Sequence, residues 1–360
     1  MKRFIFVFII FFLFGIGIGT GIKYIFAPKP ATFVWWRNQI QNVIKAPWFQ
    51  IIQSEFRRHG YILQTQDIHP PQNSDIVIWA FPKGDLSNIS EEQYLVGWLM
   101  ESPISLEQPL PEELYQKFDQ ILTYRKDLVD YKKTFFVRIF TRLGDIKKEY
   151  WETPKSVLVS QIASYHSYGA YQERTKASKW FLENAPDDFK LYGNGWENIK
   201  KELSPLAISA FNQQYGHFVE DKDKAISESK FVLAYENAIQ ADYVTEKIYD
   251  VLKSGAVPVY LGAPNINRYI PTSCFINKND FKTYDELYAF LKNMDDETYE
   301  RYRQCAYRFV QRKEVKQIEI AHRVSKLIFQ QKPQTIFNWY HKICTDINTF
   351  LHSLFNRKHT

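Results

Sequence analysis

Short apolar runs alternate with longer amphipathic segments along most of this chain. The clearest runs, residues 94–100 and 231–235, lack a polar position every second residue, which is typical of strands covered on both faces of a sheet. Further strands are expected at residues 32–36, 74–80, 120–124, 155–160 and 257–261. Between the strands lie segments with helical spacing, such as the one in which Ile248, Val251 and Leu252 share a face. This alternation predicts an α/β fold.

The most informative unit is a strand, a helix and a strand in direct succession between residues 231 and 262. The first strand ends at Glu236 and Asn237, and open parallel sheets bind ligands beyond the carboxyl ends of their strands. Asp242 and Thr245 are both plausible caps for the helix, whose amino terminus suits a diphosphate because its amide hydrogens are unpaired. Lys247 adds a full positive charge there. The unit therefore predicts a nucleotide-sugar pocket.

Three segments of this unit resemble the signature of the family 10 glycosyltransferases, the α1,3/4-fucosyltransferases. They are YEN at residues 235–237, DYVTEKI at residues 242–248 and GAVPVYLGAPNI at residues 255–266. The resemblance is specific over the carboxyl half of the chain and loose over the amino half. Ala238 departs from it, because many members carry serine there, and a hydroxyl contact to the donor is then missing.

The resemblance implies a GT-B architecture, in which two Rossmann-like domains face a cleft. The apolar segment at residues 4–22 adds an N-terminal transmembrane helix to this expected fold. The resemblance also implies GDP-fucose as the donor and transfer of fucose to a sugar hydroxyl with inversion at the anomeric carbon. The expected parts are a membrane anchor and linker at 1–30, an acceptor-binding domain at 31–150, a GDP-fucose-binding domain at 151–330 and an amphipathic helix at 331–360.

The resemblance assigns the role of general base to Glu101, which opens a Glu-Ser-Pro sequence directly after the strand at residues 94–100. An inverting transfer needs one carboxylate to take the proton of the attacking hydroxyl. The alternative is that Glu101 only caps the following turn. The resemblance also places Arg174 against the donor diphosphate, where it and Lys247 would stabilise the leaving group without a metal. Otherwise, Arg174 would be a solvated helix residue.

Glu246 is the second carboxylate that the resemblance places in catalysis, in contact with fucose, where it would stabilise positive charge on the sugar ring. Asn237, Tyr243 and Thr245 would complete the donor-binding shell. Taken without the surrounding motif, Glu246 and Lys247 are an ordinary pair in the first turn of a helix, facing water.

No essential metal or organic cofactor is expected, and Mn²⁺ or Mg²⁺ would at most stimulate the enzyme. Asp221, Lys222 and Asp223 contain the spacing of a metal-binding carboxylate pair, but no strand precedes them, so they are interpreted as solvated surface. The eight histidines lack metal-ligand spacing, and the three cysteines form no Cys-x-x-Cys motif.

Residues 4–22 contain no charged side chain and are long enough to cross a bilayer, so a single-pass anchor is preferred to a cleaved signal peptide. Basic residues flank both ends and do not decide the orientation. Two locations stay open: the Golgi membrane with a lumenal catalytic domain if the source is eukaryotic, or the inner membrane with a cytoplasmic one if it is bacterial. The small number of cysteines, which is three, favours a microbial source.

Composition adds little to this interpretation. The formal net charge of +6 over 360 residues suits an anionic donor or a membrane surface, and no motif supports nucleic acid as a partner. Glycines four apart in the anchor predict a homodimer face. The final helix, at residues 336–354, either packs across the two domains or lies on the membrane.

The predicted function is therefore an inverting fucosyltransferase acting on an acceptor glycan, with O3 of N-acetylglucosamine chosen by resemblance alone. Two alternatives stay open. One is a membrane-anchored GT-B enzyme that uses another nucleotide sugar. The other is a pseudoenzyme that binds glycans without turnover, against which the presence of Glu101, Arg174, Glu246 and Lys247 together argues.

Overall fold

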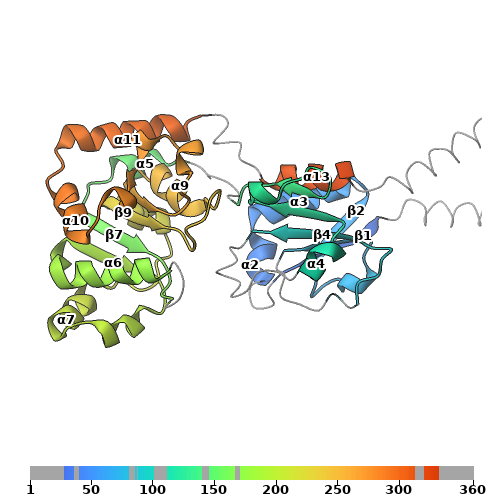
Figure 1. Ribbon diagram of the computed structural model, residues 1–360, viewed down its shortest axis with the longest axis horizontal. Coiled ribbons are helices and arrows are strands. Elements are labelled where there is room, and N and C mark those ends of the chain that lie inside the picture. Colours follow the sequence, from blue (N-terminus) through green and yellow to red (C-terminus); the bar gives the residue numbers. More distant parts are fainter. Residues whose placement is uncertain are drawn as a thin grey trace, which may run out of the picture.

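The protein is described from a computed structural model, which describes residues 28–35, 40–80, 86, 88–100, 112–139, 146–166, 171–312 and 320–331. Two parallel sheets form the centres of two units, which we call the first and the second unit (Figure 1). The expected anchor, Glu101 and the helix expected beyond residue 331 lie outside the described residues. None of the helices in the described part is both long and apolar enough to cross a membrane.

The first unit is built on a six-stranded sheet in which every neighbouring pair is parallel, in the order β2-β1-β3-β4-β5-β6. Its strands are β1 (Lys29–Val34), β2 (Tyr61–Thr65), β3 (Ile76–Trp79), β4 (Tyr94–Leu99), β5 (Gln120–Thr123) and β6 (Thr134–Phe136). All four residues of β3 and all four of β5 are buried. The central strands β3, β4 and β5 therefore lie within the strands that the sequence predicts at residues 74–80, 94–100 and 120–124.

Helices cover the first sheet: α2 (Ile40–Lys45), α3 (Pro47–Arg58) and α4 (Glu112–Lys117). Proline at the first position of α3 starts that helix without losing a hydrogen bond, since the first amides have no helical partner. The buried face of α3 is Phe49, Ile52 and Phe56. Each such side chain contributes roughly 1.5–3 kcal/mol when it leaves water.

A helix from the far end of the chain, α13 (Ile320–Gln331), also packs on the first unit. Val324 and Ile328 are fully buried in the same core as Ile52. Gln120 of β5 donates a hydrogen bond to the carbonyl of Leu327 at 3.1 Å. The sequence analysis placed these residues in the second domain, 151–330, whereas their apolar face is covered by the first sheet.

The second unit is built on a five-stranded parallel sheet in the order β11-β10-β9-β7-β8. Its strands are β7 (Val157–Ile162), β8 (Phe189–Tyr192), β9 (Ser229–Tyr235), β10 (Val257–Leu261) and β11 (Ile276–Asn277). Every residue of β10 is buried, and β9 and β10 pair from Phe231 with Val257 to Tyr235 with Leu261. The expected strand, helix and strand unit is thus confirmed.

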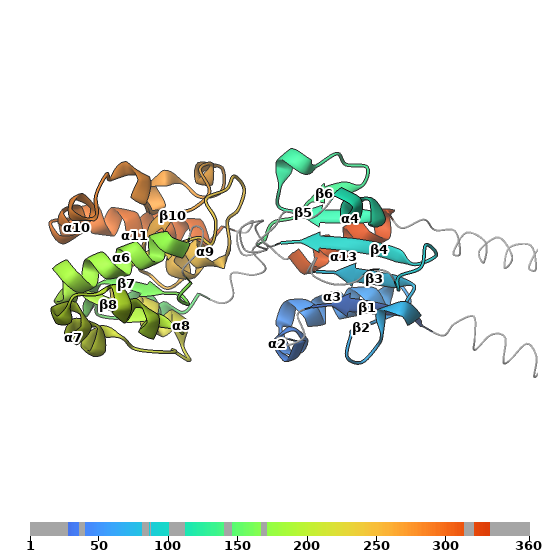
Figure 2. The ribbon, with the colours of Figure 1, turned by 60° about the horizontal axis from the view of Figure 1, so that its bottom comes forward.

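Helices lie on both faces of the second sheet (Figures 1 and 2). They are α5 (Lys148–Glu152), α6 (Tyr171–Asn184), α7 (Pro205–Gln214), α8 (Lys222–Ser227), α9 (Glu246–Lys253), α10 (Tyr284–Lys292) and α11 (Asp296–Val310). Residues of α6 and α10 share one core, which includes Phe181 and Leu287. Residues of α9 and α11 share the other, which includes Ile248 and Phe309.

Short 3₁₀ turns complete the described chain. They are η2 (Pro71–Asn73), η3 (Lys126–Leu128), η4 (Pro186–Asp188), η5 (Trp196–Glu202), η6 (Ile266–Arg268), η7 (Thr272–Cys274) and η8 (Lys278–Asp280). A disulfide between Cys274 and Cys305 joins η7 to α11. The sequence analysis gave these two cysteines no role.

The carboxyl ends of the two sheets face each other. Tyr124 follows β5 of the first unit, and its hydroxyl donates to the Gln240 side chain at 2.8 Å, in the segment after β9 of the second unit. Lys126 forms an ion pair with Asp242 of the same segment at 3.3 Å. Figure 2 shows β4 pointing toward the second unit. Side chains from both units therefore meet beyond the strand ends.

Candidate active site

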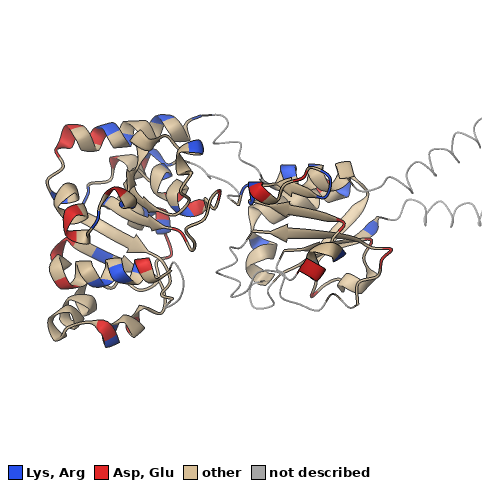
Figure 3. Ribbon diagram, in the orientation of Figure 1, with Lys and Arg blue, Asp and Glu red and all other residues tan. Residues whose placement is uncertain are grey.

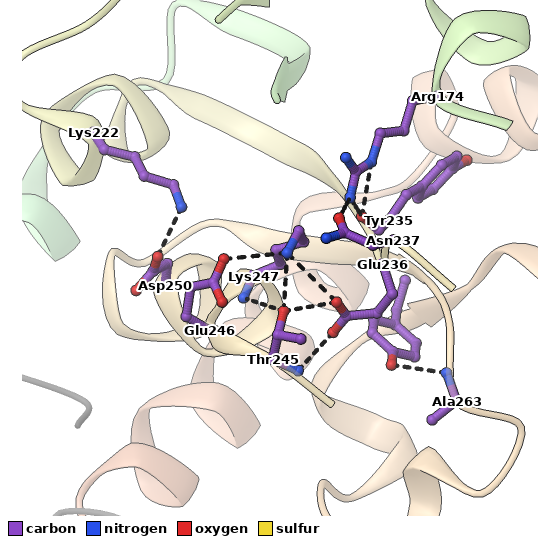
Figure 4. Close-up of polar contacts among 11 residues, drawn as sticks. Arg174, Lys222, Tyr235, Glu236, Asn237, Thr245, Glu246, Lys247, Asp250 and Ala263 are labelled. Carbon is purple, nitrogen blue, oxygen red and sulfur yellow. Dashed lines mark hydrogen bonds and ion pairs between the residues drawn. The ribbon is translucent and has the colours of Figure 1, made fainter. Parts of the chain in front are cut away.

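The candidate site lies on the segment that connects β9 to α9, residues 236–245, which we call the donor loop. Thr245 is extended and its hydroxyl accepts from the Lys247 amide at 3.5 Å, so it caps α9 as predicted. Gly255, with φ of +75°, follows the end of α9 in the left-handed conformation that favours glycine. The amino terminus of α9 is therefore fixed next to the carboxyl end of β9 (Figure 4).

Glu236, the first residue of the donor loop, carries a fully buried carboxylate. One of its oxygens accepts from the Thr245 amide at 2.8 Å and the other from the Thr245 hydroxyl at 2.6 Å. Burial raises the pKa of Glu236, and the nearby charge of Lys247 opposes that shift. A side chain at Gly262 would clash with Glu236, since an added Cβ lies 2.5 Å from its Cγ. Glu236 thus anchors the start of α9.

Lys247 lies in the first turn of α9 with its ammonium group held between three oxygen-bearing side chains. Its Nζ donates to the Thr245 hydroxyl at 3.1 Å and to Glu246 at 3.2 Å, and lies 3.7 Å from Glu236. The side chain stays 20% exposed. A partly buried cation at a helix amino terminus is an anion-binding arrangement.

Glu246 lies next to Lys247 (Figure 4), and its side chain is 51% exposed. Desolvation opposes ionisation, but the charges of Lys247 and Lys222 hold the pKa of Glu246 at about 2. The carboxylate is therefore charged over the whole physiological range. A charged, exposed carboxylate next to an anion site can stabilise positive charge on a bound sugar.

Arg174 reaches the donor loop from α6 and is only 4% exposed. Its guanidinium donates twice to the carbonyl of Tyr235, at 2.6 and 3.1 Å, and once to the side-chain oxygen of Asn237 at 2.6 Å. The guanidinium also lies 4.9 Å from the ring of Tyr171. Arg174 is therefore a buried residue that holds the end of β9, and not a solvated helix arginine.

Tyr243 and Ala238 lie together in a small apolar cluster with Tyr124 of the first unit. Tyr243 is 2% exposed, and its ring meets that of Tyr124 edge-on with 5.2 Å between centroids. Ala238, where many family members carry serine, is fully buried. A methyl group fits this apolar setting without a hydrogen-bond partner. Tyr243 thus joins the donor loop to the first unit.

The structure brings five of the seven predicted site residues to the donor loop and the start of α9: Asn237, Tyr243, Thr245, Glu246 and Lys247. Arg174 contacts this group from α6. Glu101 lies outside the described residues. Its preceding strand β4 ends at Leu99, which pairs with Thr123 of β5 next to Tyr124.

The interpretation of residues 221–223 as solvated surface holds for Asp221, which is exposed, whereas Lys222 and Asp223 are partly buried in ion pairs. Asp221 caps α8 and accepts from the Tyr150 hydroxyl at 2.8 Å, and Asp223 pairs with Lys253 at 2.9 Å. Lys222 pairs with Asp250 of α9 at 2.8 Å. These contacts tie α8 to its neighbours.

The sequence carries no local signal for the partners of residues 221–223, because Lys222 and Asp250 are 28 positions apart. Glu236 follows its strand directly but is not among the predicted site residues. The signal for Glu236 was its place before the helix cap, and its burial required the tertiary structure.

Across the described ranges, no group of three histidine, cysteine or acidic side chains is arranged to bind a metal ion. Basic and acidic residues are interspersed along the ribbon of both units (Figure 3). The positive charge at the donor loop therefore comes from particular residues, Lys247 and Arg174. Cations and helix amides of this kind attract anionic groups such as a diphosphate.

Comparison with known proteins agrees with the family resemblance of the sequence. A family model described as glycosyltransferase family 10 (fucosyltransferase), C-terminal part, matches residues 162–348. A mouse protein named 4-galactosyl-N-acetylglucosaminide 3-alpha-L-fucosyltransferase 9 is 42% identical over 99 residues, which are 26% of this chain and 28% of the mouse protein. An Arabidopsis thaliana protein named alpha-(1,4)-fucosyltransferase is 40% identical over 86 residues, 22% of this chain and 21% of the plant protein. These alignments span less than a third of each relative.

The crystal structure of an alpha1,3-fucosyltransferase with GDP-fucose superposes on this protein with a TM-score of 0.51 and 18% identity. The superposition covers 77% of this chain and 81% of that chain. At this identity the likeness shows the fold alone, which is the GT-B fold expected from the sequence.

Proposed function

This chain belongs to glycosyltransferase family 10, the fucosyltransferases, and on that premise we propose that it transfers L-fucose from GDP-fucose to a hydroxyl of an acceptor glycan with inversion. The observation that carries the proposal is the arrangement of Lys247, Arg174 and the amino terminus of α9 around the donor loop. All three attract a diphosphate, the group that leaves when the sugar is transferred.

In the proposed reaction, the acceptor oxygen attacks the anomeric carbon of fucose while the bond from that carbon to the β-phosphate oxygen breaks. Lys247 stabilises the negative charge that develops on the leaving GDP. Glu246, whose carboxylate stays charged, stabilises the positive charge that develops on the ring. Asn237, Tyr243 and Thr245 shape the donor shell, and Arg174 binds the diphosphate or fixes Asn237 against it.

Glu101 takes the proton of the attacking hydroxyl in this proposal. Its position in the sequence, two residues after β4, supports the role, because β4 pairs with β5 and Tyr124 after β5 contacts the donor loop. The carboxyl edge of the first sheet thus faces the donor loop. The first unit would then bind the acceptor, as predicted for residues 31–150, and the second unit would bind the donor, as predicted for residues 151–330.

We further propose O3 of N-acetylglucosamine as the acceptor position. The name of the mouse relative supports this choice, and that of the plant relative specifies an α1,4 linkage instead. The reaction is proposed to need no metal, with Mn²⁺ or Mg²⁺ at most stimulating, since Lys247 and Arg174 supply two side-chain cations at the donor loop. Full activity in EDTA is the expected result.

The proposed location is the Golgi membrane, with a single-pass anchor at residues 4–22 and a lumenal catalytic region. The disulfide between Cys274 and Cys305 supports an oxidising compartment, against the microbial source that the few cysteines favoured. Asn88, in the sequon Asn88-Ile89-Ser90, is exposed and reports the orientation. When it is expressed in a eukaryotic cell, the wild-type chain should lose mass on endoglycosidase treatment, and the Asn88→Gln variant should not. If the wild-type chain also loses no mass, the lumenal orientation is contradicted.

The experiment that tests the function is isothermal titration of the full chain in detergent with GDP-fucose, GDP-mannose and UDP-galactose, followed by turnover on N-acetyllactosamine. Selective binding of GDP-fucose with turnover is expected. Preference for another nucleotide sugar would show that this sugar, and not GDP-fucose, is the donor. Binding of GDP-fucose without turnover on a panel of glycans would favour a glycan-binding pseudoenzyme. Glu101→Gln should bind GDP-fucose normally and lose transfer; equal loss of binding would remove Glu101 as the base.

A further inference from the structure

Two side chains of the first unit hold the donor loop of the second. Tyr124, which is 1% exposed, donates to the Gln240 side chain at 2.8 Å and packs edge-on against the ring of Tyr243. Lys126 pairs with Asp242 at 3.3 Å. Tyr124 directly follows the buried strand β5, and Lys126 begins the η3 turn three residues after the strand ends.

Asp242 is the centre of these contacts and has an unusual backbone. Its φ of +66° lies in the left-handed region, which L-residues other than glycine rarely adopt and aspartate adopts more often than most. The side chain accepts from Asn265 at 2.9 Å and from the Tyr269 hydroxyl at 2.6 Å, and the Asp242 amide donates to Asn265 at 2.9 Å. Such a conformation persists only where surrounding contacts fix it.

The Asp242 carboxylate is charged and its side chain is 8% exposed. Burial works against ionisation, but hydrogen bonds from Tyr269 and Asn265 and the charge of Lys126 hold the pKa of Asp242 below its ordinary value. Lys126 is itself positioned over two aromatic rings, 4.8 Å from the centroid of Phe136 and 4.9 Å from that of Tyr269. The charge partner of the buried Asp242 is thus supplied by the other unit.

We propose that Tyr124 and Lys126 of the first unit, together with Gln240 and Asp242 of the second, form an interdomain clasp that holds the donor loop in its donor-binding conformation. Tyr124 and Lys126 are positioning residues in this inference, since they act through the loop and not on the donor. The inference rests on the proposed function only for the identity of the donor.

The clasp has a quantitative consequence for binding. If the donor loop adopts its binding conformation only part of the time, the apparent affinity for the donor falls by that fraction. Removing the Lys126 charge leaves Asp242 without its partner from the first unit and frees the loop to leave the left-handed turn. The apparent Kd for GDP-fucose should then rise by about fivefold, which is the upper end of the effect expected when a partly exposed ion pair is lost.

The test compares Lys126→Met with Lys126→Arg, which keeps the charge, and with Lys132→Met, an exposed lysine of the same unit. Hydrogen exchange of the full chain, without donor, reports the loop through the protected amides of Asp242 and Tyr243. Titration with GDP-fucose measures the affinity of each variant for the donor. Tyr124→Phe, which keeps the ring and removes only the hydroxyl, is a milder second variant if Lys126→Met fails to fold.

We expect faster exchange at residues 237–245 and weaker GDP-fucose binding in Lys126→Met, with Lys126→Arg and Lys132→Met close to wild type. If Lys126→Met and Tyr124→Phe exchange hydrogen at residues 237–245 at the same rate as Lys132→Met, the clasp is overturned, whichever donor the protein binds. If the wild-type protein does not bind GDP-fucose but exchange still differs, the proposed function fails and the clasp stands. Weaker binding with unchanged exchange would also contradict the clasp, because Lys126 would then act on the donor directly.

Discussion

Glu236 and Lys247 lie on either side of the Thr245 hydroxyl, which donates to the Glu236 carboxylate at 2.6 Å and accepts from the Lys247 ammonium at 3.1 Å. The carboxylate is fully buried and the ammonium is partly exposed. The pair therefore differs from a surface ion pair, because the buried partner fixes the direction in which the exposed one points. Lys247 is thereby aimed at the amino terminus of α9.

Glu236→Gln should lower the free energy of unfolding by about 1–3 kcal/mol, because an amide nitrogen cannot accept the hydrogen bond that one carboxylate oxygen accepts now. Glu246→Gln is the matched control. Its side chain is half exposed, so stability should stay within about 0.5 kcal/mol while transfer slows. Urea unfolding and turnover of both variants check this prediction, and equal stability of the two would contradict the anchoring role of Glu236.

Arg174→Lys should weaken GDP-fucose binding by about tenfold, although the charge is kept, because one ammonium cannot replace the planar fork that reaches both Tyr235 and Asn237. Lys176→Met, on the same helix and exposed, should bind like the wild type. Isothermal titration measures both. Unchanged affinity in Arg174→Lys would mean that Arg174 acts as a point charge on the diphosphate and not through Asn237.

The disulfide between Cys274 and Cys305 closes a loop of 31 residues. A loop of that length predicts about 3–4 kcal/mol of stabilisation from the reduced entropy of the unfolded chain. Reductant should therefore lower the urea midpoint of the wild type and leave that of a Cys274→Ser, Cys305→Ser variant unchanged. A wild-type midpoint that does not respond to reductant would show that the bond does not form.

Lys155 predicts a specific dependence of stability on pH. Burial, reinforced by the charge of Arg303, lowers the pKa of Lys155 from 10.5 to about 8, and its ammonium donates to the carbonyl of Ser227 at 2.6 Å. Between pH 8 and 10.5 the unfolded chain keeps the proton that the folded protein has lost, so folding becomes more favourable as pH rises.

The unfolding free energy of the wild type minus that of Lys155→Met should therefore increase from pH 7 to pH 10. The difference between the two proteins cancels other groups that titrate in this range. Urea unfolding at both pH values measures it, and a difference that stays constant or falls would show that Lys155 is not desolvated.

Much of the second unit follows from local sequence. The apolar run at residues 257–261 is the strand β10 with the same bounds, and Thr245 caps α9 as its position before Glu246 predicted. These features depend on neighbours within a few residues, where backbone geometry and side-chain type suffice. The motif residues were placed for the same reason, since one loop and one helix start carry most of them.

Asp242 shows where local sequence fails. It was a plausible cap for α9, yet it lies in a left-handed turn whose partners are Asn265, Tyr269 and Lys126. The last of these is more than 100 positions away in the chain, beyond any pattern of spacing. The return of α13 to the first sheet is another long-range contact of this kind, because its apolar face fits either sheet until the chain has folded.

By itself, the sequence determined seven of the described strands but not β2, β6, β8 and β11. It also determined the start of α9, the family motif and the residue types that suit a nucleotide sugar. Only the tertiary structure decided that Glu236 is buried, that Arg174 reaches the donor loop, that Cys274 meets Cys305 and that the first unit holds Asp242. The physical reason is that hydrogen-bond spacing and apolar periodicity act along the chain. Burial and charge pairing depend on which distant segments share one place in the fold.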